Sequence, residues 1–286
     1  MNIRDNFLKS NLYHFEETDF IWHDNSVFRL NEIRSGIEKI AIIAENDIFL
    51  GLTKDPLIFL NDLKLLNSNI NPDLLILASR HTSKTARPAF LVHTTGNWSD
   101  DTDFGGRPRD LSKASAILHK AGFFSLFQQE KLEELKNFSI DIEVTHHGPT
   151  LIEKPLIFME LGSSKHEWVI KEAGKYLANA IIQTVFKYLE FVRLDNQKIG
   201  LGFGGTHYTP NFNRLIRNAN IAMSFICPKY YIQDLDKDLI SKMINNTLEK
   251  VDYFIVDWKG TNSDDKKHLL PLLEDFKIPV KKTKDF

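Results

Sequence analysis

Polar side chains with catalytic potential gather where strand-like apolar runs of the sequence end. The near-continuous apolar runs before them are typical of strands buried on both faces. In parallel α/β sheets, ligands bind beyond the carboxyl ends of the strands, so polar segments at several such ends predict one shared crevice. These segments are ASRHTS at 78–83, VHTTGNW at 92–98, THHGPT at 145–150, ELGSS at 160–164 and GFGGTHYTP at 202–210.

Histidines and one glutamate are the chemically active residues of these segments. Neutral imidazoles and a carboxylate suit zinc, which with an open position lowers the pKa of bound water to about 7. The same groups suit a metal-free acid/base set, because the imidazole pKa lies near neutrality. Both alternatives stay open at this point. The candidate catalytic residues are His81, His93, His146, His147, Glu160 and His207, and those that fit the zinc alternative are His81, His146, Glu160 and His207.

The adjacent pair His146 and His147 follows a strand-like run and precedes Gly148 and Pro149, which allow the chain to turn sharply. Neighbouring side chains on an extended chain point to opposite faces. We therefore expect the two imidazoles to differ. One should face the crevice, and the other should pack against a neighbour or orient it.

Several common site motifs are missing from the sequence. The chain has no GxSxG elbow, which gives a serine hydrolase little support. It also has no GxxxxGK[ST] phosphate loop. Its single cysteine, Cys227, excludes an intramolecular disulfide and zinc sites of the Cys₄ or Cys₂His₂ type, and it favours a reducing compartment.

Composition and charge indicate an ordinary globular protein. Of the 286 residues, 42% are hydrophobic and 26% are charged, and the formal net charge is −2. These values exclude wholesale disorder and a generally basic protein that coats nucleic acid. Met1–Ser10 shows no signal peptide, and no stretch has the roughly 18 apolar residues of a membrane span. We expect a cytoplasmic protein with no membrane partner.

Strand-like runs alternate with helical patterns, which predicts an α/β fold with a mostly parallel or mixed sheet and helices on both faces. We expect one domain over 1–286, with a polar loop over 98–110 that is either a functional lid or a disordered excursion. The expected strands are Lys39–Ala44, Asp73–Ala78, Ala89–Thr94, Ile140–Thr145, Leu156–Leu161, Lys198–Phe203, Ala219–Ile226 and Tyr253–Asp257. The expected helices are Ser112–Gly122, Ser125–Asn137, Lys165–Phe191, Asn211–Asn218, Asp234–Glu249 and Asp264–Phe276.

Taken together, the motifs resemble the archaeal and plant D-aminoacyl-tRNA deacylase family. Their order and spacing match the family over roughly 72–230, and THHGPT followed by ELGSS is the most specific part. The other matching motifs are Ser79-Arg80-His81, Val92-His93, Gly96-Asn97, Gly204-Gly205 and His207-Tyr208.

This resemblance implies a cytosolic esterase that frees D-amino acids from mischarged tRNA, with zinc as a cofactor whose ligands it does not assign. It implies a fold similar to bacterial peptidyl-tRNA hydrolase and the purine nucleoside phosphorylases. It also implies that an N-terminal strand of the family is missing here, and that Met223-Ser224 replaces a Gly-His of the family. The site residues that it implies are His81, His93, Asn97, His146, His147, Glu160 and His207.

Basic, aromatic and small polar residues near the expected crevice are candidates for binding the substrate. Arginine and lysine contact phosphates, and an aromatic ring, here Trp98 or Tyr208, stacks on the terminal adenine. Nearby aspartates dilute the positive charge, so an ordinary surface is the alternative. The candidates are Arg80, Asn97, Trp98, Arg107, Arg109, Lys113, Ser163 and Tyr208.

We expect D-aminoacyl-tRNA as the substrate, no obligate protein partner, and a monomer. Two other functions stay open. A phosphorylase-like or zinc-dependent hydrolase of a small metabolite would also use a histidine-rich crevice. A non-catalytic protein that binds the end of tRNA would keep the fold without the activity.

Overall fold

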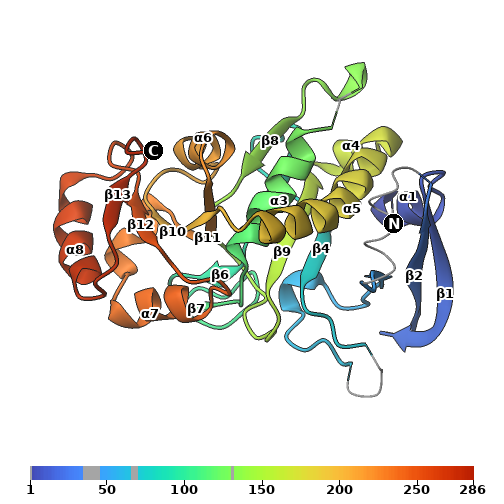
Figure 1. Cartoon of the computed structure of the whole chain (residues 1–286), viewed down its shortest axis with the longest axis horizontal. Helices are drawn as coiled ribbons and strands as arrows, with labels where there is room; N and C mark the ends of the chain where they lie inside the picture. Colours follow the sequence, from blue (N-terminus) through green and yellow to red (C-terminus); the bar gives the residue numbers. More distant parts are fainter. Residues whose placement is uncertain (1, 35–45, 66–69, 130–131) are drawn as a thin grey trace.

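The computed structural model describes residues 2–34, 46–65, 70–129 and 132–286 and contains two four-stranded sheets with helices packed against them (Figure 1). A three-stranded sheet lies at the N-terminal end, and a two-stranded sheet lies beside the long polar loop. The architecture confirms the α/β class with parallel and mixed sheets. The likeness to peptidyl-tRNA hydrolase and the purine nucleoside phosphorylases stays a prediction.

The first four-stranded sheet has the order β4-β9-β5-β8 and is mixed. β4 pairs parallel with β9 and β5 pairs parallel with β8, whereas β5 and β9 are antiparallel. β5 and β9 are buried along their whole length, as their near-continuous apolar sequences predict. The strands are β4 (Leu75–Arg80), β5 (Ala89–His93), β8 (Ser139–Ile142) and β9 (Leu156–Gly162).

The second four-stranded sheet has the order β11-β10-β12-β13 and is entirely parallel. Parallel neighbours need crossover connections, and these place helices on both faces. α6 packs in the hydrophobic cluster on one face, and α7 and α8 pack in the cluster on the other. The elements are β10 (Lys198–Phe203), α6 (Pro210–Asn218), β11 (Ile221–Cys227), the 3₁₀ turn η3 (Lys229–Asp234), α7 (Lys237–Asn245), β12 (Tyr253–Val256), α8 (Ser263–Glu274) and β13 (Val280–Lys282).

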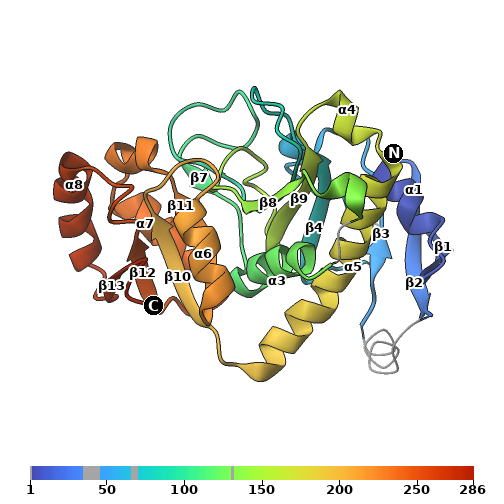
Figure 2. The ribbon, with the colours of Figure 1, turned by 90° about the horizontal axis from the view of Figure 1, so that it is seen from above.

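Helix α3 (Ala116–Phe127) lies between the two sheets and contacts both (Figure 2). Nine of its twelve residues are buried, as expected for a helix enclosed on several sides. It begins where the Ser115 hydroxyl accepts a hydrogen bond from the Leu118 N–H. The sequence analysis expected two helices here, over 112–122 and 125–137; the structure has this single helix and a 3₁₀ turn, η2 (Glu133–Leu135).

The long helix expected from Lys165 is interrupted near its start. A short α4 (Lys165–Trp168) precedes α5 (Lys171–Leu194). The Asn2 side chain donates hydrogen bonds to the carbonyls of Trp168 and Ile170. The N-terminal segment thus satisfies two backbone carbonyls at the break between the helices. α3 and α5 together cover one face of the first sheet with the apolar side chains of the main core.

The N-terminal segment forms elements that the strand pattern did not predict. Its long antiparallel hairpin closes through His23 and Asp24, both at positive φ, as a two-residue hairpin turn requires. The expected strand over 39–44 lies outside the described residues. The elements are α1 (Asn2–Leu8), β1 (Tyr13–Trp22), β2 (Asn25–Ile33), β3 (Phe49–Leu50) and the 3₁₀ turn η1 (Leu57–Phe59).

The polar loop leaves one short strand, β6 (Gly96–Asn97), and returns through another, β7 (Asp110–Leu111). The amide of Asn97 donates to the carbonyls of Gly105 and Arg107, at 2.8 and 3.0 Å, and so holds the loop from inside. The loop is therefore an ordered, packed segment, and the alternative of a disordered excursion is wrong. No helix among the described residues is long and apolar enough to cross a membrane.

The buried histidine of α3 predicts a loss of stability in acid. His119 is 1% exposed, its Nδ1 lies 2.8 Å from the Met223 carbonyl, and burial lowers its pKa to about 4. The unfolded chain takes up this proton near pH 6.5 and the folded protein only near pH 4. The free energy of unfolding is therefore fully retained above pH 6.5 and falls as the pH drops toward 4, by about 3 kcal/mol from this residue.

We expect His119→Gln to remove that part of the acid sensitivity, while the matched change at exposed His14, His14→Gln, leaves it in place. Urea denaturation of each variant at several pH values between 7 and 4 measures the difference. Equal slopes of stability against pH for all three proteins would contradict the assignment.

Candidate active site

Three residues lie on one face of the first sheet because of strand register: the candidates His93 and Glu160, and Glu143. Glu160 lies opposite Leu91, and His93 lies opposite Phe158, so Glu160 and His93 point to the same face. The chain just past β8 continues this pattern, since the Glu143 N–H bonds to the Val92 carbonyl. Helices α3 and α5 cover the other face, which leaves this one for the site.

His81 reaches the same face from the end of β4. Its N–H bonds to the Leu161 carbonyl, which places it beside Gly162 at the end of β9. A Cβ atom at Gly162 would lie 2.8 Å from the Cβ atom of His81. Glycine at position 162 therefore makes room for the imidazole.

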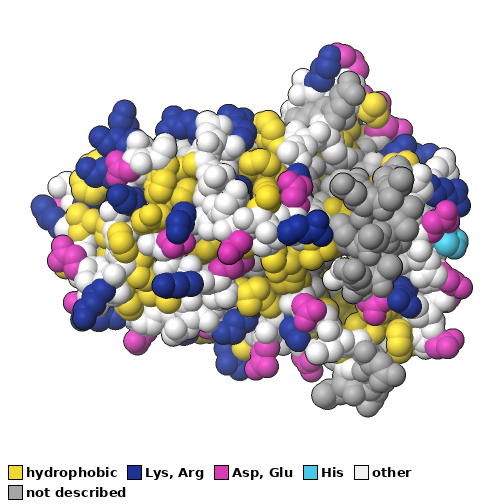
Figure 3. Space-filling view, viewed as in Figure 1, with side chains coloured by type: hydrophobic (Ala, Val, Ile, Leu, Met, Phe, Trp, Pro, Cys, Tyr) yellow, Lys and Arg dark blue, Asp and Glu magenta, His cyan; other side chains and the backbone are white. Residues whose placement is uncertain are grey.

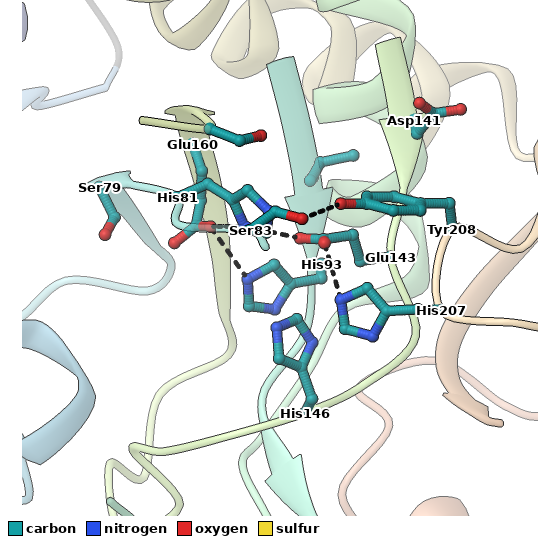
Figure 4. Close-up of polar contacts among 12 residues, drawn as sticks. Ser79, His81, Ser83, His93, Asp141, Glu143, His146, Glu160, His207 and Tyr208 are labelled. Carbon is teal, nitrogen blue, oxygen red and sulfur yellow. Dashed lines mark hydrogen bonds and ion pairs between the residues drawn. The ribbon is translucent and has the colours of Figure 1, made fainter. Parts of the chain in front are cut away.

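Two buried carboxylates connect the imidazoles (Figure 4). His81 Nδ1 lies 3.2 Å from Glu160 Oε2 and 3.6 Å from Glu143 Oε2. His207 Nε2 lies 2.9 Å from Glu143 Oε1, and His93 Nε2 lies 3.9 Å from Glu160 Oε2. Both carboxylates thus have an imidazole on each side, which is the pairing that buried charges need.

His146 and His147 complete this histidine–glutamate cluster, but not as the sequence predicted. Strand β8 ends at Ile142, and His147 has a φ of 46°, so the pair lies in a turn and not in an extended strand. The ring centres of His146 and His147 lie 4.2 and 4.8 Å from that of His93, and 4.5 Å from each other. The expectation that they occupy opposite faces is wrong, because alternation applies only within an extended strand.

The second sheet holds this turn in place. The Thr145 N–H donates to the Ile226 carbonyl, and the Ile226 N–H donates back to the Thr145 hydroxyl. The Val144 N–H donates to the His207 carbonyl at 2.9 Å. The loop after β10 that carries His207 is therefore fixed against the turn that carries His146, and their ring centres lie 4.8 Å apart.

Burial and neighbouring charges divide the histidines into two protonation classes. Burial and the nearby histidines hold the pKa of His146 well below its ordinary value, and the same causes lower the pKa of His147 to about 4. Burial also acts against charge on His81 and His93, but their contacts with the two carboxylates outweigh it and raise both pKa values. The pKa values of neighbouring imidazoles are thus shifted in opposite directions.

Three of the imidazoles have the arrangement found in metal ligands. The Nδ1 atoms of His93, His146 and His147 lie 3.0, 2.8 and 2.6 Å from backbone carbonyls. A carbonyl only accepts, so each Nδ1 carries a hydrogen, and Nε2 is the nitrogen that can bind a metal when the ring is neutral. One ring nitrogen from each lies within 4.8 Å of the others, which fits a zinc ion bound by three histidines.

Two further groups of possible ligands share the cluster. One is Glu143, His146 and His207, and the other is His81, Glu143 and Glu160. The four residues that the sequence analysis proposed as zinc ligands all lie in the cluster. Each of the three groups, however, also contains at least one residue that was not proposed as a ligand. Glu143 was missed because a single glutamate in an apolar run gives no local signal; its only sequence cue is its position two residues before the Thr145 segment.

Several candidate substrate residues form the rim of the cluster. The Tyr208 hydroxyl donates to the Ser83 hydroxyl, and the Arg87 guanidinium lies 4.7 Å from the centre of the Tyr208 ring. Arg80 lies 4.9 Å from the ring of Trp168, whose indole N–H bonds to the His81 carbonyl.

Other candidates are engaged inside the protein. Trp98 is 1% exposed and donates its indole N–H to the Thr145 carbonyl, so it is not available to stack on a base. Ser163 is buried and donates to the Arg87 carbonyl. Arg109 pairs with Asp236 before α7, and the Lys113 ammonium donates to Asn246 at its end. The Arg107 side chain is exposed.

Comparison with known proteins gives a consistent result. The family model described as D-aminoacyl-tRNA deacylase matches residues 68–281. A D-aminoacyl-tRNA deacylase of Thermococcus onnurineus is 33% identical over 278 residues, which cover 96% of this chain and 92% of that protein. One of Methanocaldococcus jannaschii is 33% identical over 208 residues, or 71% of this chain and 79% of that protein. A crystal structure of a "conserved protein of unknown function AF0625" is 30% identical and aligns with a TM-score of 0.80, covering 99% of this chain and 91% of that one.

The electrostatics of the cluster predict how its histidines titrate. The charge of Glu143 helps to raise the pKa of His81, so Glu143→Gln should lower that pKa. The matched change Asp141→Asn removes a carboxylate that pairs with Arg87 and should leave His81 as it is. NMR of the imidazole nitrogens in chelator-treated protein measures both. An unshifted His81 in Glu143→Gln would show that the pairing does not exist in solution.

Proposed function

Because this chain belongs to the D-aminoacyl-tRNA deacylase family, we propose that its histidine–glutamate cluster hydrolyses the ester between a D-amino acid and the 3′-terminal adenosine of tRNA. The observation that carries the proposal is the meeting of five imidazoles and two carboxylates on the sheet face that α3 and α5 leave free. An aminoacyl ester is already activated. Its hydrolysis mainly needs an oriented water and a stabilised oxyanion.

In this proposal, His207 is the base. The carboxylate beside Nε2 places the proton on that nitrogen, which leaves Nδ1, 3.3 Å from the Tyr230 hydroxyl, as the acceptor. A water that replaces the Tyr230 hydroxyl at Nδ1 gives up a proton to that nitrogen as its oxygen bonds to the ester carbonyl carbon. Glu143 holds the imidazole in the tautomer that this step needs.

His81 supplies the acid. Its Nδ1 hydrogen-bonds to Glu160, and its Nε2 is buried without a hydrogen-bond partner among the described residues. Its contacts with the two carboxylates raise its pKa and so favour the protonated ring, which donates its Nε2 hydrogen to the ribose oxygen as the ester C–O bond breaks. The products are the free D-amino acid and tRNA with its terminal hydroxyl restored.

We also infer a zinc ion at His93, His146 and His147, on the donor set described above. When bound, zinc supplies a Lewis acid that polarises a carbonyl or lowers the pKa of a bound water. The low pKa values of His146 and His147 support this role, because a ligand imidazole must be neutral. They make the same two rings poor bases, which is why the base is assigned to His207.

The proposal also covers the residues that contact tRNA, the cellular compartment and the oligomeric state. Arg80, Arg107 and Tyr208 are the candidates that remain for contact with the acceptor end, since they lie on the rim or are exposed. A tRNA substrate supports a cytoplasmic location. We propose a single domain that works as a monomer.

The central test compares matched D- and L-aminoacyl-tRNA at equal enzyme concentration. We expect rapid release of the D-amino acid and little release of the L-form. Equal rates on the two enantiomers would overturn the proposed function. The same assay after exhaustive chelation tests the metal: retained turnover would remove zinc and leave the acid/base assignment in place.

A second test uses the two adjacent histidines. Because both rings lie in the cluster and both are partly exposed, His146→Ala and His147→Ala should each lower kcat at least a hundredfold while the melting temperature changes little. His14→Ala, on the exposed face of β1, is the control and should match the wild type. If one variant unfolds while the other only loses activity, the two side chains have different roles after all.

A further inference from the structure

A second polar site opens beside the histidine–glutamate cluster, at the carboxyl edge of the parallel sheet. It is a pocket of about 360 Å³ lined by Lys229, Tyr230, Lys259, Gly260, Asn262 and Asp265. Lys229 follows the end of β11 and Lys259 follows the end of β12, on either side of the central strand β10. From β10 the chain crosses to β11 on one side and then returns past β10 to β12 on the other, and this reversal makes the edge the switch point at which open α/β sheets bind ligands.

The two lysines give the pocket its charge. Both are exposed, and within the described residues neither ammonium has a hydrogen-bond or ion-pair partner. The one carboxylate in the lining, Asp265, is buried and already accepts from the Gln233 amide at 2.8 Å. Lysine and arginine side chains are also frequent over the neighbouring end of the molecule, formed by α8 and β13 (Figure 3). The Asp257 carboxylate beneath the pocket is likewise engaged, by the Asn211 amide and the Gly260 N–H, so the two unpaired ammonium groups favour an anion.

The floor of the pocket is rigid. Asp257, 3% exposed, accepts from the Gly260 N–H at 3.1 Å and from the Asn211 amide at 3.0 Å. A Cβ atom at Gly260 would lie 2.4 Å from an Asp257 oxygen, and Gly205 on the facing loop has a φ of 81°. The Lys229 N–H bonds to the Gly205 carbonyl, which fixes the base of that lysine. The lysines therefore project from a fixed frame.

One residue joins this pocket to the cluster. The ring of Tyr230 lines the pocket, and its hydroxyl lies 3.3 Å from His207 Nδ1. A substrate whose ester lies at the cluster therefore places its next group toward the lysines. In an aminoacyl-tRNA the ester is on the ribose of the last nucleotide, and the nearest anion is the 5′-phosphate of that same nucleotide.

We propose that the pocket between Lys229 and Lys259 binds the 5′-phosphate of the terminal adenosine of tRNA. The two ammonium groups hold the phosphate as point charges, and Tyr230 separates it from the reacting ester. Asp264 and Asp265 occupy the first turn of α8, so the lysines and not the helix end supply the attraction. This inference rests on the proposed function and assigns one part of its substrate.

The test compares two minimal substrates, the D-aminoacyl esters of adenosine and of adenosine 5′-monophosphate. The wild type should hydrolyse the phosphate-bearing ester with at least tenfold higher kcat/KM. In Lys229→Ala/Lys259→Ala that preference should fall close to one, and Lys229→Arg/Lys259→Arg should restore most of it. Lys171→Ala/Lys175→Ala removes the same charge from exposed positions on α5 and should keep the full preference.

On whole D-aminoacyl-tRNA, the alanine pair should raise KM about tenfold and reduce the slope of log KM against log salt by about 0.7, the value for one phosphate on a single strand. A wild type with no preference between the esters, or an alanine pair that keeps the preference, overturns the phosphate pocket while deacylation by the wild type stands. A wild type that releases D-amino acid from none of these substrates overturns the proposed function itself.

Discussion

Two carboxylates are buried side by side, and their pairing with imidazoles is the constraint on which the site depends. Glu143 and Glu160 are 1% and 3% exposed, and an ionised carboxylate at such depth is costly without a partner. His81 lies between them, and His93 and His207 lie on their outer sides. The strand ends must therefore come together for either charge to be tolerated. The carboxylate–imidazole contacts of the site therefore form as the chain folds.

The two sheets contribute different parts of this arrangement. The first sheet supplies a wall whose register places His93 and Glu160 on one face. The second sheet supplies the loop with His207 and holds the turn after β8 through hydrogen bonds between Thr145 and Ile226. Helix α3 ties the sheets together, since its His119 bonds to the β11 backbone. A change in how the sheets pack would therefore separate His207 from the carboxylate that orients it.

The location of each function follows from the direction of the strands. In the mixed first sheet the carboxyl ends of β4 and β5 point in opposite directions. The side chains of the histidine–glutamate cluster therefore lie on one face of the sheet and not along one edge. In the parallel second sheet the carboxyl ends do share an edge, and there the lysine pocket forms. Tyr230 bridges the two regions. The proposed substrate crosses from the edge of one sheet to the face of the other.

Local sequence predicted the strands of the two four-stranded sheets from β4 to β12, because near-continuous apolar runs such as 156–161 are typical of strands buried on both faces. It also determined which residue types carry the chemistry. The partners were decided by tertiary structure. Glu143 joined the cluster through register with β5, His146 and His147 came together because β8 ends before them, and Trp98 was withdrawn into the core. Residue type and local pattern are properties of a few neighbours in the chain, whereas burial and pairing depend on segments that meet only after folding.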